Sequence, residues 1–357
     1  MLKDFIHQVR QNCRLASGAQ AGYFSLCGLL LRLRLLYKWE QGLFPWQEPE
    51  ADAVLDWIAR QESAWDSLDG QSCGSLPLNG LVLDPFEVEA VNLQLQPQGL
   101  AYGAGFTRGL APTFFLGELA EVRREGEITV LVLGPELARD LAGTPALCQG
   151  ALVYARQQAL TYYLWDHLSD PSQQNNPFLK IALEAYQITL PDLLQAPTAY
   201  QGEFQELVRT ELESAIRHEM GEAREESLRP VFGPLLEMFP QTRIELWLRG
   251  VKDALAEVNE SGRLHYLIEA RQLPSLALML AWQPGLYPLL LPELEAAFKD
   301  LLSGGDWLVV EQARLSALKR LRRIAAELRE LLESLEDRPL EKIREEIERR
   351  YLQPLGL

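Results

Sequence analysis

The chain has 357 residues, of which 47% are hydrophobic and 24% are charged, values that are typical of a folded globular protein. Its formal net charge of −16 argues against a nucleic-acid partner, which requires a basic surface, and disfavours adsorption to an anionic membrane. The N-terminal sequence MLKDFIHQVRQNC carries charges throughout and lacks an apolar core, so we expect no secretory signal.

Two apolar stretches could be mistaken for membrane spans. Residues 23–37 contain two arginines, and residues 273–291 are interrupted by Gln283-Pro284-Gly285, so neither provides the roughly 20 apolar residues that a membrane helix needs. The cysteines form no CxxC pair, which predicts reduced, buried thiols and a cytoplasmic protein. They are Cys13, Cys27, Cys73 and Cys148.

The first 75 residues are predicted to form a layer of helices. Hydrophobic periodicity indicates helices over Leu2–Asn12, Gly22–Glu40 and Glu50–Trp65. The helix over Gly22–Glu40 is apolar on nearly every side, so we expect it to be central to this layer. A linker rich in Gly, Ser and Pro follows over Asp69–Gly80.

Residues 76–156 are predicted to form a small, mostly antiparallel sheet. Short β-prone runs separated by glycine-containing turns are typical of a meander. The expected elements are strand entry at Leu81–Leu83, a helix over Pro85–Val91, strands over Leu100–Phe106, Thr113–Leu119 and Glu127–Leu133, a helix from Gly134-Pro135 through Leu141, and a strand over Ala151–Tyr154.

The remainder of the chain is predicted to be helical. We divide it into residues 157–305 and a C-terminal helical hairpin over 306–357, and we expect all segments to form one integrated unit. The helix over Trp307–Glu333 has an apolar stripe opposite mixed charges, so it either packs within the chain or binds a protein partner or a second copy. The predicted fold class is α+β and predominantly helical, with the small sheet flanked by N-terminal helices and a large C-terminal helical part.

One predicted helix, over residues 202–226, contains an unusual pattern. Its N-terminal half presents an apolar stripe that includes Phe204, Leu207 and Leu212. Further along the helix, ionisable side chains occupy the same face. Such side chains are costly to bury unless ion pairs or hydrogen bonds compensate them. These side chains are Glu211, His218, Glu219 and Glu222.

Two His-x-x-x-Glu pairs suggest a metal site. His218 and Glu222 lie four residues apart, as do His265 and Glu269 on a later helix, so each pair presents an imidazole and a carboxylate on one face. The sequence His-Glu-Met-Gly-Glu resembles the zincin helix, and the second pair lies where gluzincins have their third ligand.

The resemblance to zincins implies a metal-dependent hydrolase. His218, Glu222, His265 and Glu269 would bind zinc, or manganese or iron because a carboxylate replaces the second histidine. Glu219 would act as general base and Glu211 would orient a ligand. Two alternatives remain: a di-metal carboxylate redox site, and a non-catalytic scaffold or partner-binding protein whose buried ionic network needs no metal.

Several stretches also resemble a family of uncharacterised bacterial proteins. The resemblance extends over most of the chain and implies one intact unit, but it gives no residue a role. It is carried by AGYFSLCGLLLRLRLLYKWEQGLFPWQEPE, YGAGF, FFLGEL, RHEMGEA and RLHYLIEAR.

Overall fold

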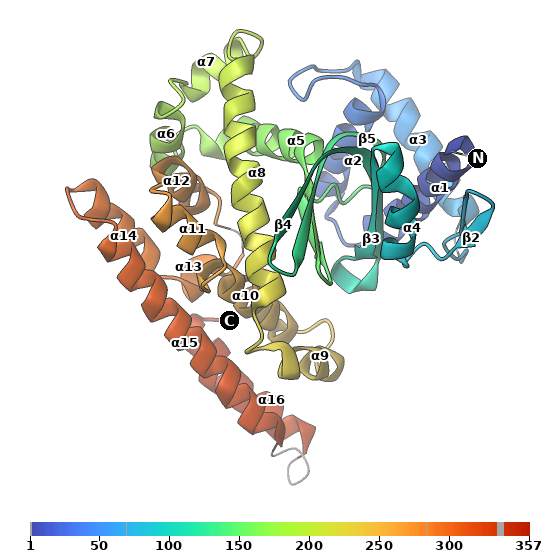
Figure 1. Ribbon diagram of the computed structural model, residues 1–357. Helices are drawn as coiled ribbons and strands as arrows, with labels where there is room; N and C mark the ends of the chain where they lie inside the picture. Colours follow the sequence, from blue (N-terminus) through green and yellow to red (C-terminus); the bar gives the residue numbers. More distant parts are fainter. Residues whose placement is uncertain (1, 69, 284, 334–338) are drawn as a thin grey trace. The chain divides into compact units, whose positions relative to one another are not determined.

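The computed structural model describes residues 2–68, 70–283, 285–333 and 339–357. The chain forms two compact units. The first unit contains the residues up to Gln174 together with Leu190–Leu212, and the second contains Asn175–Thr189 and Glu213–Leu357. Helix α8 (Gln201–Arg224) therefore contributes to both units (Figure 1).

The first unit begins with three helices, as the sequence predicts. They are α1 (Leu2–Ala21), α2 (Leu26–Glu40) and α3 (Ala51–Leu68). Helix α1 is nine residues longer than expected, and α2 begins after Ser25, whose hydroxyl accepts a hydrogen bond from the Gly28 amide at 3.2 Å. A serine at this position satisfies an amide that the first turn leaves without a helical partner.

A two-stranded and a five-stranded sheet follow these helices. The small sheet pairs β1 (Leu76–Leu78), which lies within the predicted linker, with β2 (Leu81–Leu83). The larger sheet has the order β3-β4-β5-β7-β6, in which only β5 and β7 are parallel. Its strands are β3 (Leu100–Phe106), β4 (Pro112–Glu125), β5 (Ile128–Arg139), β6 (Ala146–Gln149) and β7 (Leu152–Arg156).

The predicted helix from Gly134 to Leu141 is wrong, because β5 continues to Arg139. Gly117 lies opposite Glu136 and Leu119 opposite Leu133, so β5 has one more residue than β4 in this interval. Gly134-Pro135 is the bulged dipeptide, and a bulge tolerates proline because its missing amide is not needed in the ladder.

Helix α1 packs against the larger sheet and forms the main core of the first unit. Phe5, Val9 and Cys13 of α1 lie in one buried cluster with Tyr102 and Phe114 of the sheet. Helix α4 (Val88–Leu95) supplies Asn92, whose side-chain oxygen accepts from the Tyr102 amide at 2.9 Å and whose amide donates to the Tyr102 carbonyl at 2.7 Å. The other helices of this unit are α5 (Gln157–Ser169) and α7 (Leu190–Gln195).

The second unit is helical in its described part, as predicted. Leu291 and Pro292 separate two of its helices, one ending at Leu290 and the next beginning at Glu293. No helix in the described part of the chain is both long and apolar enough to cross a membrane. The helices are α6 (Pro177–Glu184), α9 (Arg229–Met238), α10 (Arg243–Val258), α11 (Arg263–Glu269), α12 (Leu273–Ala281), α13 (Tyr287–Leu290), α14 (Glu293–Leu302), α15 (Leu308–Glu333) and α16 (Leu340–Ile347).

The apolar stripe of α15 is used inside the second unit. Its buried face includes Leu318, Leu321 and Leu328. The segment after α16 returns to α15, where the Tyr351 hydroxyl donates to Glu327 at 2.7 Å. The final helices are therefore anchored to the unit along one face, and their other face, which carries charged side chains and the exposed Leu308 and Leu315, remains outside.

Candidate functional site

His218 of α8 faces a carboxylate on α10 rather than one on its own helix. Its Nδ1 lies 3.0 Å from Oε1 of Glu257. Burial alone would lower the pKa of His218, but the facing Glu257 carboxylate and the nearby Glu219 raise it to about 9. His218 is therefore protonated at neutral pH and donates this hydrogen bond.

Glu257 is the centre of a buried network. Its side chain has no exposed surface, and it accepts hydrogen bonds from two other elements of the second unit. Arg263 of α11 donates through Nε at 2.8 Å and also through Nη2, and the Tyr287 hydroxyl of α13 donates at 3.0 Å. Although burial raises the pKa of Glu257, Arg263 and His218 lower it to about 2.

Two glycines allow the backbones to approach closely enough for this network. A Cβ on Gly221 of α8 would lie 2.1 Å from the carbonyl oxygen of Ala256, and one on Gly262 would lie 2.2 Å from the same atom. Asn259 at the end of α10 donates from its side chain to the Gly221 carbonyl at 2.7 Å. The crossing of α8 and α10 is thus set by backbone contact, which places His218 opposite Glu257.

The other residues of the predicted metal site have different surroundings. Glu222 accepts from Lys252 of α10 at 2.5 Å, and His265 Nε2 lies 3.4 Å from Oε1 of Glu269. Glu219 is half-buried and Glu211 is buried. Within the ranges that the structure describes, no group of three or more His, Cys, Asp or Glu side chains is arranged to hold a metal ion.

Sequence reasoning missed Glu257 and Tyr287. Glu257 lies on the buried stripe of α10 together with Trp247, Val251 and Ala254, at the helical spacing of an apolar face. The same helical-wheel test that selected His218 would have selected Glu257. Tyr287 gives no such signal, because its hydroxyl meets Glu257 only after α13 has packed against α10.

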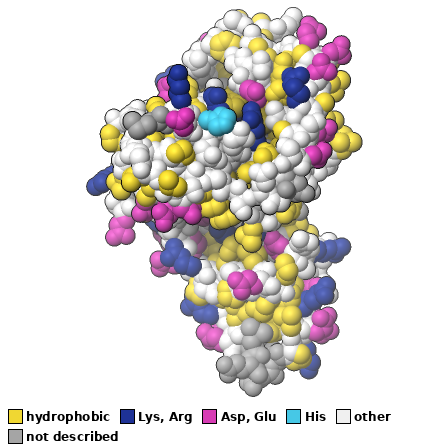
Figure 2. All heavy atoms as spheres, turned by 90° about the vertical axis from the view of Figure 1, so that its right-hand side faces the viewer, with side chains coloured by type: hydrophobic (Ala, Val, Ile, Leu, Met, Phe, Trp, Pro, Cys, Tyr) yellow, Lys and Arg dark blue, Asp and Glu magenta, His cyan; other side chains and the backbone are white. Residues whose placement is uncertain are grey.

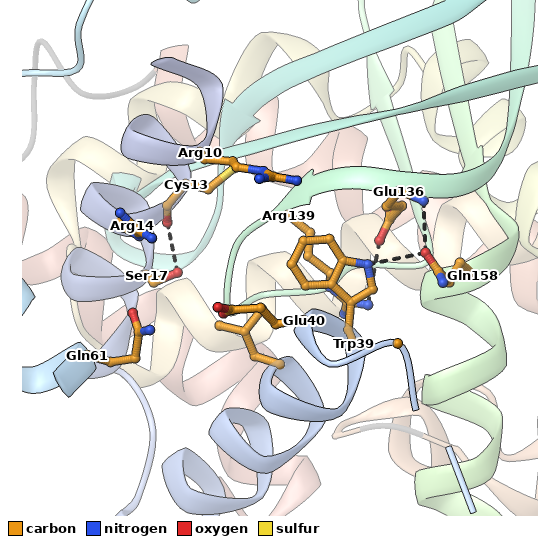
Figure 3. A pocket seen from close by; sticks show the side chains of 12 residues that line it. Arg10, Cys13, Arg14, Ser17, Trp39, Glu40, Gln61, Glu136, Arg139 and Gln158 are labelled. Atoms are coloured by element: carbon orange, nitrogen blue, oxygen red, sulfur yellow. Dashed lines mark hydrogen bonds and ion pairs between the residues drawn. The ribbon is translucent and has the colours of Figure 1, made fainter. Parts of the chain in front are cut away.

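A separate pocket of about 380 Å³ lies in the first unit. Figure 3 shows side chains from α1, α2, α3, β5 and α5 around it. Its lining includes three arginines, Arg10, Arg14 and Arg139, and the indole of Trp39. This concentration of cations contrasts with the net charge of −16 and with the interspersed acidic and basic side chains on the face drawn in Figure 2.

Arg139 is the most deeply buried of the three arginines, with 6% of its side chain exposed. Its Cζ lies 5.8 Å from the ring centre of Trp39 and 5.7 Å from that of Tyr162, distances at which a cation is attracted to an aromatic face. Burial lowers the pKa of Arg139, and Glu136 opposes this effect. The side chain remains a cation at neutral pH because its ordinary pKa is far above 7.

Comparison with known proteins gives a family and no function. Residues 4–156 match the N-terminal domain, and residues 161–350 the C-terminal domain, of a family of unknown function named DUF6866. No curated protein and no solved structure shows significant similarity to the chain. The chain therefore belongs to the DUF6866 family.

Proposed function

We propose that the second unit is a non-catalytic helical scaffold and that the network around Glu257 fixes the junction of α8, α10 and α11. The observation that carries this proposal is the complete burial of the Glu257 side chain among three donors, His218, Arg263 and Tyr287. A buried carboxylate that is hydrogen-bonded to donors from several helices favours one arrangement of those helices.

The hydrogen-bonded ion pair of His218 with Glu257 forms without a metal ion, which supports the scaffold. A metal ligand must be a neutral imidazole with a free lone pair. A pKa of about 9 leaves His218 protonated at pH 7, with both ring nitrogens as donors. Binding a metal through Nε2 would require loss of the proton on that nitrogen, while Nδ1 would keep its hydrogen bond to Glu257.

The partner of such a scaffold is proposed to be a protein, bound through the outer face of α15. Leu308 and Leu315 are exposed, by 58% and 48% of their surface, and they lie seven residues apart on one side of the helix. Size-exclusion chromatography with light scattering, on the full chain and on Leu315→Glu, tests whether this face joins two copies.

A metal-dependent hydrolase remains the second candidate, with His218, Glu222, His265 and Glu269 as ligands of zinc, manganese or iron and Glu219 as base. One observation favours a metal site over the scaffold. Nδ1 of His265 is buried and has no hydrogen-bond partner among the described residues. A buried nitrogen of this kind is costly unless it finds a ligand.

Elemental analysis distinguishes the two functions. The protein is purified without a metal-affinity tag, together with His218→Ala and His265→Ala, and its melting temperature is measured with and without EDTA. The scaffold predicts no stoichiometric transition metal, no effect of EDTA, and a lower melting temperature for His218→Ala in both buffers. About one or two equivalents of metal, lost in both variants, would refute the scaffold and support a metal site shared by the two helices.

A further inference from the structure

The pocket in the first unit contains a buried cation with unused hydrogen-bond donors. Nε and Nη1 of Arg139 are buried and have no hydrogen-bond partner among the described residues. Gly143, at a positive φ of 54°, leaves room for the guanidinium, since a Cβ there would lie 2.2 Å from Nη2. An arginine that lines a cavity with free donors is arranged to bind a planar anion.

The carboxylates nearby accept from other donors, including Glu40 from the Trp57 indole at 3.2 Å, although Oε2 of Glu136 has no hydrogen-bond partner among the described residues. Glu136 accepts from Nε of Arg156 at 2.5 Å, whereas Nη1 of Arg139 lies 3.5 Å from its Oε2. Asp140 accepts from the Phe114 amide at 2.9 Å and from Gln20 at 3.0 Å. Arg139 and Arg156 thus share the carboxylate of Glu136. The pocket lining has three arginines against Glu40 and Glu136, which leaves an excess of positive charge.

The remaining lining combines accessible cations with a fixed aromatic wall (Figure 3). Arg10 and Arg14 are exposed and lie four residues apart on α1, so they occupy one face of that helix. The Trp39 indole donates to Gln158 at 3.2 Å, and the same oxygen of Gln158 accepts from the Glu136 amide at 2.8 Å. These bonds hold the indole in place beside the Arg139 guanidinium.

We propose that this pocket binds a small organic anion. Arg139 binds the carboxylate or phosphate group, and the apolar part of the anion lies against Trp39. Arg10 and Arg14 attract the anion electrostatically from solvent. The volume of about 380 Å³ is within the usual range for small-molecule sites. The site goes beyond the scaffold function, because it is built entirely from residues of the first unit.

Isothermal titration calorimetry on the full chain tests the proposal. The probes are phenyl phosphate, benzoate and inorganic phosphate, with benzamide as the neutral control. We expect at least one aromatic anion to bind and benzamide not to bind. Comparing phenyl phosphate with benzoate identifies the preferred acid group, whereas equal binding of inorganic phosphate would overturn the role of Trp39 and the assignment to an organic anion.

Variants locate the binding. Arg139→Met is expected to weaken it by about tenfold or more, because it removes the charge-assisted hydrogen bonds to the anion. Arg14→Ala is expected to weaken binding by a few fold, since an exposed charge mainly affects the association rate. Arg124→Ala, which removes an exposed cation of β4 away from the pocket lining, is expected to leave it unchanged.

Circular dichroism checks that each variant is folded. If Arg139→Met does not fold, the double variant of Arg10→Ala and Arg14→Ala tests the proposal instead. Both side chains are exposed, so we expect this variant to fold. Absence of binding to every anion, binding of benzamide as strong as that of benzoate, or equal affinities in the pocket variants and in Arg124→Ala would each overturn the proposal.

Discussion

Replacing Glu257 by glutamine tests whether the buried network stabilises the second unit. The substitution keeps the shape of the side chain and removes its charge. Arg263 would then be left without its carboxylate partner, and His218, whose pKa Glu257 raises, would lose its proton and its ion pair. Breaking a buried ion pair by removing one partner costs about 3–5 kcal/mol, so we expect a loss of this size in the free energy of unfolding at pH 7.

Urea denaturation followed by circular dichroism at 222 nm measures this loss. Glu269→Gln is the matched control, because it removes the carboxylate of the other His-Glu pair, whose side chain is 70% exposed. An exposed pair of this kind contributes only about 0.5 kcal/mol. A loss below about 1 kcal/mol for Glu257→Gln, or one no larger than that of the control, would refute the reasoning.

Two further substitutions test the packing of each unit. Gly221→Ala would place a Cβ 2.1 Å from the Ala256 carbonyl oxygen, so we expect urea denaturation to show a loss of roughly 2–3 kcal/mol. Gly202→Ala, whose Cβ meets nothing within 4 Å, is the control and should not destabilise the helix. Asn92→Ala leaves the Tyr102 amide without its partner in a buried site. We expect a loss of roughly 3 kcal/mol, and an unchanged melting temperature would contradict this.

Much of the fold could be predicted because hydrophobic periodicity is a local property of the sequence. The period of α8 and α15 identified both helices, and a β-prone run bounded by glycine-containing turns identified β3. Gly134-Pro135 misled the prediction because proline is favoured in a first helical turn and is also tolerated at a bulge. Only the register against β4 distinguishes these two cases.

The candidate sites were harder to predict because their residues meet through tertiary packing. His218 stood out on its own helix, but its partner Glu257 is 39 residues away. The pocket combines Arg10, Trp39 and Arg139 from three separate elements, and the sequence placed Arg139 in a helix rather than at the end of β5. A helical wheel detects a polar side chain on an apolar face, but it does not identify what that side chain contacts.

The pH dependence of stability tests the central claim that His218 is a protonated partner of Glu257. The pKa of His218 is raised from 6.5 to about 9 in the folded protein. The resulting stabilisation is fully present below pH 6.5 and is lost as the pH rises through about 9. The difference corresponds to about 3 kcal/mol.

The measurement compares the free energy of unfolding of the wild-type protein and of His218→Gln from pH 5 to pH 10. We predict that the advantage of the wild-type protein is largest below pH 6.5 and falls by about 3 kcal/mol by pH 10. A metal site would give the opposite trend, because a neutral imidazole ligand forms only as the pH rises. An advantage that stays constant, or that grows between pH 5 and pH 8, would contradict the account.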